Sequence, residues 1–151
     1  MLENIIIGLL TMTLCLILQS VMLVITVHYY NKYEYLLSTH HYSSTMIVLT
    51  MVMFMLILGN LAQISIWAIL FMILGEFNHF SESFYHSTVN FATLGYGDIV
   101  MSEKHKLLGG LEAVNGILMI GVTTAMLIET FKEAIHKMMD ARKKLSDSSL
   151  S

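Results

Sequence analysis

The sequence predicts an all-α membrane protein with three transmembrane helices and one shorter helix between the second and the third. Composition is the first reason, because 56% of the 151 residues are hydrophobic and only 13% are charged, as is typical of integral membrane proteins. The second reason is length. Three apolar runs can each cross a hydrocarbon core roughly 30 Å thick as a helix.

The first apolar run, Ile5–Val27, is uncharged and about 23 residues long. A secretory signal peptide is the alternative, but that would need a basic N-terminus and a shorter apolar core. Here Glu3 is acidic and no Lys or Arg precedes Lys32. We therefore expect a retained transmembrane span, in which Cys15 serves in packing.

A polar and aromatic stretch, His28–Tyr42, follows the first run. Tyrosines of this kind favour the membrane–water interface. The adjacent His40 and His41 could form a metal or pH-sensing site, but neighbouring side chains on a helix diverge. The stretch is therefore predicted to be an interfacial loop.

The second apolar run, Met46–Gly75, is about 30 residues long, so a helix over it should tilt or protrude. Asn60 and Gln63 lie three residues apart and therefore share one face of that helix. Because polar amides in lipid need a partner, we expect this face to meet another helix. A transport role for the two amides is the less favoured alternative.

A short helix is predicted over Glu82–Ala92, after a polar turn at Glu76–Phe80. Ser81 is the expected N-cap, and Glu82 in the first turn suits the helix dipole. About eleven residues are too few to span a membrane, so the segment should dip in and return. Such a path is tolerated only where protein or a water-filled cavity surrounds the backbone.

The third apolar run, Leu107–Ile128, contains four glycines, which allow close helix packing. It also contains Glu112 and Asn115, and an ionisable residue at membrane depth marks a site by default. We expect Glu112 near the outer end. Residues 131–151 should continue as a charged helix with a Ser-rich tail, whose Lys and Arg residues suit the cytosolic face and anionic lipid.

The segment between the short helix and the third run reads Thr93-Leu94-Gly95-Tyr96-Gly97-Asp98. In this setting it resembles the selectivity filter of potassium channels. Five fixed letters of T-x-G-Y-G-D arise by chance on the order of once in 10⁴–10⁵ such chains. The alternative is a Gly-rich turn between two helices. Rings of backbone carbonyls replace the water of a dehydrated cation in such filters, and glycines supply the left-handed backbone angles that this arrangement needs.

The resemblance implies a role for each residue of the motif. The permeant ion would be K⁺, and no other cofactor is expected. The ion-lining carbonyls would be those of Thr93, Leu94, Gly95 and Tyr96. Gly97 and Asp98 would form the outer mouth, where the aspartate attracts cations.

Three residues depart from the usual family pattern. Leu94 replaces a valine, which should alter packing more than chemistry because only its carbonyl faces the ion. Ala92 replaces a common threonine. Val89 occupies a place where some members carry a buried glutamate that pairs with the filter aspartate.

Filter support is therefore expected from other residues. Tyr85 and His86 stand where many members carry two aromatic residues, and Glu112 should lie behind the filter. We expect Asp98 to be held in place by contact with Tyr85, His86 or Glu112.

The inner helix of the family often hinges at a glycine. Gly116 is the preferred candidate here and Gly121 the second, with close packing on the pore helix as an equally favoured alternative. By resemblance, the cavity and inner mouth are lined by a stripe on one helical face, made of Leu118, Gly121, Ala125 and Glu129. Glu129 would form a ring of carboxylates, or else be an ordinary helix-end charge.

The resemblance covers residues 46–131, the pore module. Residues 1–45 would add a transmembrane helix and a cytosolic loop, and residues 132–151 a basic cytosolic tail. One chain supplies one filter strand, so a homotetramer in membrane lipid is expected. With the N-terminus outside and the C-terminus cytosolic, six of the eight Lys and Arg residues lie inside. The small size suggests a prokaryotic inner membrane.

Other functions fit the sequence less well. The net charge of −3 argues against nucleic acid. No Ser/His/Asp set, metal-ligand spacing or phosphate loop indicates an enzyme. Two rivals stay open: a weakly selective cation channel, and a non-conducting membrane subunit of a larger complex. No repeated Arg or Lys marks a voltage sensor, and His79, His86 and His105 are candidates for a proton sensor.

Overall fold

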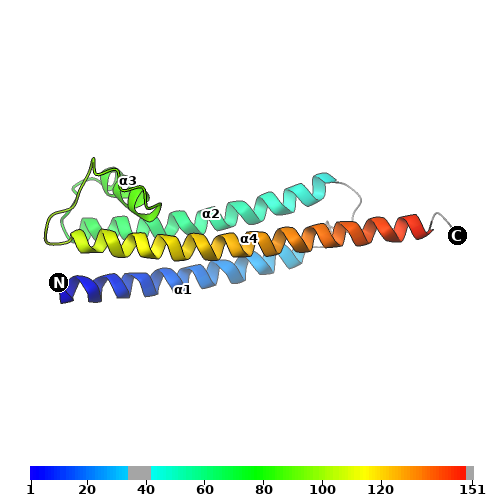
Figure 1. Cartoon of the computed structure of the whole chain (residues 1–151), viewed down its shortest axis with the longest axis horizontal. Coiled ribbons are helices and arrows are strands. Elements are labelled where there is room, and N and C mark those ends of the chain that lie inside the picture. The colour runs from blue at the N-terminus through cyan, green and yellow to red at the C-terminus, as the bar shows by residue number, and fades with distance from the viewer. Residues whose placement is uncertain (34–41, 149–151) are drawn as a thin grey trace. The chain divides into compact units, whose positions relative to one another are not determined.

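The computed structural model describes residues 1–33 and 42–148, and the side chains of residues 33, 42–45, 141, 142 and 144–148 are not among those described. Within these residues four helices follow one another (Figure 1). They are α1 (Leu2–Tyr33), α2 (Tyr42–Ile73), α3 (Phe80–Phe91) and α4 (Lys106–Ser148).

Three of these helices are long and apolar enough to cross a membrane, which confirms the predicted number of spans. The qualifying stretches are Leu2–Lys32, Met46–Ile73 and Lys106–Asp140. The fourth helix, α3, has only 12 residues, about 18 Å at 1.5 Å per residue, so it cannot span.

Several of the predicted boundaries were wrong. Helix α1 runs to Tyr33, so the first part of the predicted loop is helical. Tyrosine and lysine tolerate a helix at the membrane interface, and charge alone does not end one. Residues 34–41 of that loop, including His40 and His41, lie outside the described residues, and Tyr42 begins α2. The side chains of Arg142 and Lys144 in the predicted basic tail are also not described.

Ser81 does not cap the short helix. Helix α3 begins one residue earlier than Ser81, and its N-cap is His79, whose side chain makes no capping hydrogen bond. The backbone N–H of Ser83 instead bonds the carbonyl of His79 at 3.2 Å. Glu82 does lie in the first turn, as predicted.

The chain divides into two compact units, of which the first contains the candidate site. This unit consists of Met1–Val21 and Leu58–Val122. Its largest cluster of buried apolar side chains comprises Cys15, Trp67, Phe71, Phe77 and Leu108. A second cluster joins Ile64, Phe91 and Met119. Cys15 is fully buried, so its predicted packing role is confirmed.

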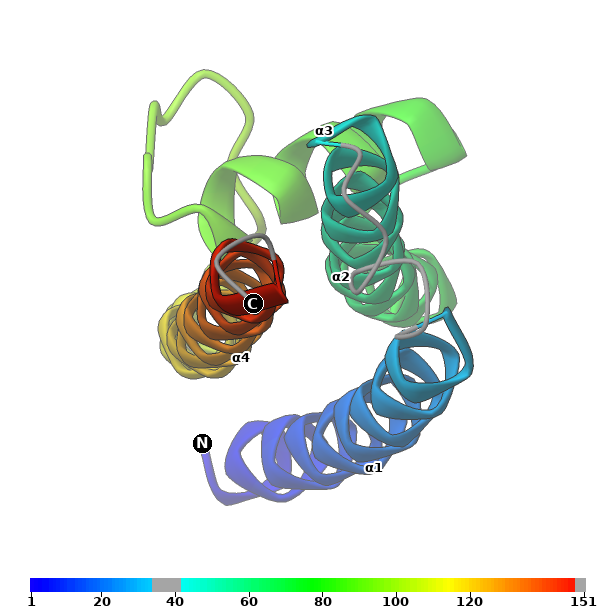
Figure 2. The ribbon, with the colours of Figure 1, turned by 90° about the vertical axis from the view of Figure 1, so that its right-hand side faces the viewer.

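Helix α3 folds back against α2 within this unit. Ser83 is fully buried, and its hydroxyl donates a hydrogen bond of 2.7 Å to the Ala68 carbonyl. Figures 1 and 2 show α3 and the following loop on one side of α4, with the first half of α1 on the other side.

A buried amide pair joins α1 and α2. Gln63 is fully buried, and its Nε2 donates a 2.7 Å hydrogen bond to Oε1 of Gln19. The prediction that the face of Gln63 meets another helix is confirmed. The second unit consists of Met22–Ile57 and Thr123–Ser151, and its core is made of Tyr30, Val48, Leu49, Val52, Leu56 and Ala134.

Candidate functional site

The loop after α3 has an unusual backbone. Thr93, Gly95 and Gly97 have positive φ angles of 59°, 56° and 73°, whereas Leu94 and Tyr96 do not. Alternate residues of the motif are therefore left-handed, as predicted for the two glycines. Thr93 was not predicted, because a β-branched residue pays roughly 1–2 kcal/mol to adopt this conformation.

Two backbone bonds fix the start of this loop on the end of α3. The N–H of Thr93 bonds the Asn90 carbonyl at 2.8 Å, and that of Leu94 bonds the Val89 carbonyl at 2.9 Å. These bonds use carbonyls that the helix end would otherwise leave unpaired. They hold the strained Thr93 in place.

Tyr85 is the residue that contacts Asp98. Its hydroxyl donates a hydrogen bond of 2.7 Å to Asp98 Oδ2. This bond lowers the pKa of the Asp98 carboxyl and raises the pKa of the Tyr85 hydroxyl, because it favours an ionised acceptor and a protonated donor. Of the three predicted partners of Asp98, the structure therefore brings together Tyr85 and Asp98.

His86 contacts the backbone one residue farther on. Its Nδ1 lies 2.9 Å from the Ile99 carbonyl oxygen, and its Nε2 lies 2.8 Å from Nδ2 of Asn90. The imidazole is buried and packs against the rings of Phe71 and Phe77. His86 thus links α3 to the segment that leaves the loop.

Glu112 lies in the second turn of α4 and is fully buried. Its neighbours include Ser87 and Asn90 of α3. Within the part of the chain that the structure describes, neither carboxylate oxygen has a hydrogen-bond partner, and the same holds for the side chain of the buried Asn115. Glu112 therefore lies beside α3 and makes no hydrogen bond to Asp98, and its support of the filter stays a prediction.

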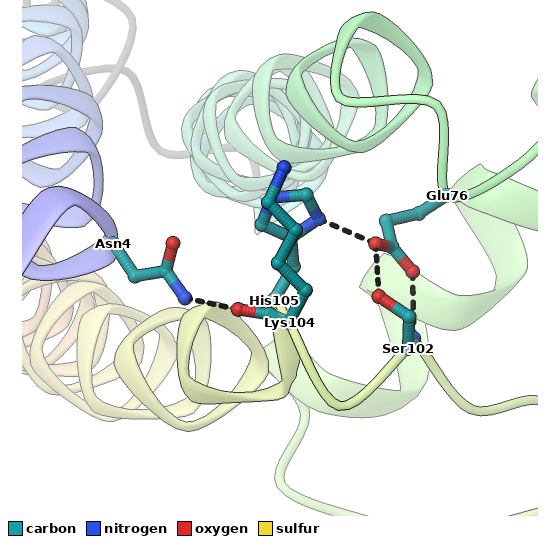
Figure 3. Close-up of polar contacts among 5 residues, drawn as sticks. All are labelled: Asn4, Glu76, Ser102, Lys104 and His105. Atoms are coloured by element: carbon teal, nitrogen blue, oxygen red, sulfur yellow. Dashed lines mark hydrogen bonds and ion pairs between the residues drawn. The ribbon is translucent and has the colours of Figure 1, made fainter. Parts of the chain in front are cut away.

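A second polar cluster, which the sequence did not reveal, joins the turn before α3 to the segment before α4 (Figure 3). The carboxylate of Glu76 accepts three hydrogen bonds, from the N–H of Ser102 at 2.7 Å, the Ser102 hydroxyl at 2.6 Å and Nδ1 of His105 at 2.5 Å. Beside it, Asn4 of α1 donates to the Lys104 carbonyl at 2.5 Å.

The surroundings of Glu76 act on its ionisation in two directions. Burial raises the pKa of the Glu76 carboxyl, but the bonds from Ser102 and His105 outweigh burial and leave the pKa below its ordinary value. Glu76 is thus an ionised anchor that ties residues 102–105 to the end of α2. No sequence signal pointed to this pairing, since 29 residues separate Glu76 from His105.

Gly116 lies against the C-terminal end of α3. A Cβ atom at this position would lie 2.0 Å from the Phe91 carbonyl oxygen, so only glycine allows the observed approach. A Cβ at Gly121 would meet nothing within 4 Å. The structure thus shows the close packing that was one of the two readings of Gly116, while its role as a hinge stays a prediction.

The predicted stripe on α4 is exposed along its length, at Leu118, Gly121, Ala125 and Glu129. Glu129 makes no ion pair with the residues described, whereas Glu133 pairs with Lys137. No group of three or more His, Cys, Asp or Glu side chains in the described parts could hold a metal ion.

Comparison with known proteins adds two findings. Residues 46–133, more than half of the chain, match a family model described as "Ion channel". Over 70 residues the chain is 29% identical to the potassium voltage-gated channel protein Shal of Drosophila melanogaster. That alignment covers 46% of this chain and 12% of the Shal protein, so the chain spans only a small part of that relative. No solved structure matches the chain.

Proposed function

The chain belongs to the ion channel family, and on that premise we propose that it is a potassium channel whose selectivity filter is the loop Thr93–Asp98. It is an integral membrane protein with three helices able to span the bilayer. K⁺ would pass down its electrochemical gradient, without any bond being made or broken.

One observation carries the proposal: the alternation of positive φ angles at Thr93, Gly95 and Gly97 within a TLGYGD loop that follows a helix too short to span. Left-handed residues at every second position allow successive carbonyls to turn toward one side. The carbonyls of Thr93, Leu94, Gly95 and Tyr96 would then replace the hydration shell of K⁺. The similarity to a potassium channel protein supports the choice of ion.

A single copy of the loop cannot surround an ion, so the proposal includes a homotetramer. Leu94 is 54% exposed and Tyr96 66% exposed in the single chain, and both belong to a non-helical segment. Three further copies around a central axis would cover these side chains and bury α3. Non-helical backbone at membrane depth requires such burial.

Orientation and gating belong to the same proposal. With Lys32 and the basic C-terminal segment in the cytosol, the loop would face the outside of a membrane of prokaryotic type. The exposed stripe that contains Leu118 and Glu129 would line the inner cavity. Gly116, at the contact with Phe91, would be the place where movement of α4 reaches the filter.

The test is cation flux into liposomes that carry the purified protein, with K⁺ and Na⁺ compared under equal gradients. We expect K⁺ flux to exceed Na⁺ flux by at least about tenfold. Equal fluxes would point to a weakly selective cation channel instead. Absence of flux together with a monomeric protein in mild detergent would contradict the proposal.

Two glycine variants give a matched comparison. Gly75 and Gly95 both have positive φ, and a Cβ at either position would meet nothing within 4 Å. Alanine should therefore impose a similar backbone strain, about 1–2 kcal/mol, at each position. Gly95→Ala should abolish selective flux while Gly75→Ala keeps it. Equal losses in both variants would show that the loop has no special role.

A further inference from the structure

Polar side chains from all four helices are buried together in the first unit. They are Cys15 of α1, Trp67 of α2, Ser87 of α3, and Glu112 and Asn115 of α4, and each is fully buried. The Cys15 thiol neighbours Trp67, Asn115 and Glu112, and Glu112 neighbours Ser87. We call these residues the polar cluster, and all of them belong to one compact unit.

Most polar atoms of this cluster have no hydrogen-bond partner among the described residues. The unpaired atoms are Nε1 of Trp67, Oγ of Ser87, both carboxyl oxygens of Glu112, and Oδ1 and Nδ2 of Asn115. Buried polar atoms in folded proteins almost always have a partner, either in the protein or in ordered water. Because so many unpaired atoms lie in one place, a single shared ligand explains them better than a separate loss at each.

Neighbouring buried polar groups of the same unit are paired directly. Ser83, which shares a face of α3 with Ser87 because it lies four residues earlier, donates a 2.7 Å hydrogen bond to the Ala68 carbonyl. Nε2 of Gln63 donates to Oε1 of Gln19 at 2.7 Å. The packing of this unit therefore does provide partners for buried polar groups, and the polar cluster departs from that pattern.

The chemistry of the unpaired atoms indicates which ligand they would hold. The Trp67 indole can only donate, the carboxyl oxygens of Glu112 can accept, and the side chains of Ser87 and Asn115 can do both. A cation would leave the indole N–H without an acceptor, and an anion would face the carboxyl oxygens. Water both donates and accepts, and a buried water molecule makes about three hydrogen bonds to such groups.

Asn90 offers water a route to the cluster. This residue of α3 neighbours Glu112. It also lines a cavity of about 540 Å³ that opens beside the loop, together with Thr93 and Gly95. Water in that cavity is therefore separated from Glu112 by one polar side chain.

We propose that the polar cluster is a binding site for ordered water, held between α4 and the other three helices. The water donates to Glu112 and accepts from the Ser87 hydroxyl and the Trp67 indole. It thereby ties α3, which precedes the loop, to α4 by hydrogen bonds. Under the proposed function this is a link between the pore helix and the inner helix, but the site itself does not depend on conduction.

The first experiment compares Ser87→Ala with Ser83→Ala by the midpoint of unfolding in mixed detergent micelles. Removing a buried hydroxyl that is hydrogen-bonded destabilises a protein, whereas removing one that lacks a partner does not. Both serines are fully buried in α3, so the change in helix propensity is the same in the two variants. We expect both midpoints to shift downward. A midpoint of Ser87→Ala at or above that of the unaltered chain would overturn the proposal.

The second experiment detects the water itself, in the unaltered protein in mild detergent. Brief X-ray pulses make hydroxyl radicals from water, and the radicals oxidise reactive side chains beside them. Trp67, the one tryptophan of the chain, is the reporter. Met119 is the matched control, because it is also reactive and fully buried but lies in an apolar cluster with Ile64 and Phe91.

Mass spectrometry should find oxidation at Trp67 and none at Met119, and Asn115→Leu should abolish the oxidation at Trp67. No oxidation at Trp67 in the unaltered chain would overturn the proposal, even if Ser87→Ala is destabilising, since a direct bond from Ser87 to Glu112 would also explain that loss. Equal oxidation of Trp67 and Met119 would overturn it too, because radicals would then reach the whole core.

Discussion

Replacing Gly116 by alanine should damage both stability and selectivity, because the contact between α4 and α3 leaves no room for a methyl group. The added Cβ would lie 2.0 Å from the Phe91 carbonyl oxygen, 2.8 Å from its carbon and 3.0 Å from its Cα. A favourable C···O contact needs roughly 3.3 Å. All three atoms belong to the backbone, so a helix must move rather than a side chain.

The magnitude follows from two opposing contributions. Overpacking of a tight contact costs about 1–3 kcal/mol, and alanine regains about 0.5–1 kcal/mol over glycine within a helix. Gly116→Ala should therefore lower the free energy of unfolding by about 1–2 kcal/mol. A Cβ at Gly121 would meet nothing within 4 Å, so Gly121→Ala should show only the stabilisation that alanine gives over glycine within a helix.

The assay is unfolding of both variants in mixed detergent micelles, followed by far-UV circular dichroism, together with the K⁺ to Na⁺ flux ratio. We expect Gly116→Ala to be less stable and less selective, because Phe91 precedes the filter by two residues and would carry it along. Gly121→Ala should match or exceed the unaltered chain. Equal stability of the two variants would refute the close contact and leave only the hinge reading.

Three other predictions concern hydrogen bonds. Tyr85→Phe should let the pKa of Asp98 return toward its ordinary value, so that acid block of flux begins at higher pH. Glu76→Gln should lower the free energy of unfolding by about 1–3 kcal/mol at neutral pH. Because the pKa of Glu76 is lowered in the folded protein, the unaltered chain should keep this advantage above about pH 4.5 and lose it as the pH falls further. A difference in unfolding free energy that stays constant down to about pH 3 would contradict this. Gln19→Leu and Gln63→Leu should each destabilise the protein more than the double variant does, because each single change leaves one buried amide without its partner. In this double-mutant cycle, losses of unfolding free energy that simply add would show that the two amides are not coupled.

The helices were predictable because their apolar runs exceed the thickness of a bilayer, but their ends were not. Helix α1 ends at Tyr33, several residues after Val27, the end of the predicted apolar run. Hydropathy does not mark this end, because both helices and loops occur at the membrane interface. His79, not Ser81, is the N-cap of α3, although its side chain makes no capping hydrogen bond. Local preferences are weak against tertiary packing.

The candidate site was predictable where single residues carry the signal. Glycine permits positive φ, so the conformation of Gly95 and Gly97 could be foreseen, whereas that of Thr93 depends on its bond to Asn90. A partner for Gln63 could be inferred from its polarity, but its identity as Gln19 required the fold. The same holds for Glu76 and His105, which no local pattern connects.

The central claim is tested most directly by the reversal potential of the reconstituted protein in a planar bilayer, with K⁺ on one side and Na⁺ on the other. The account predicts a large potential, close to the limit for a membrane permeable to K⁺ alone, with the K⁺ side negative. A reversal potential near zero, with current that persists in Gly95→Ala, would contradict a potassium-selective filter at Thr93–Asp98.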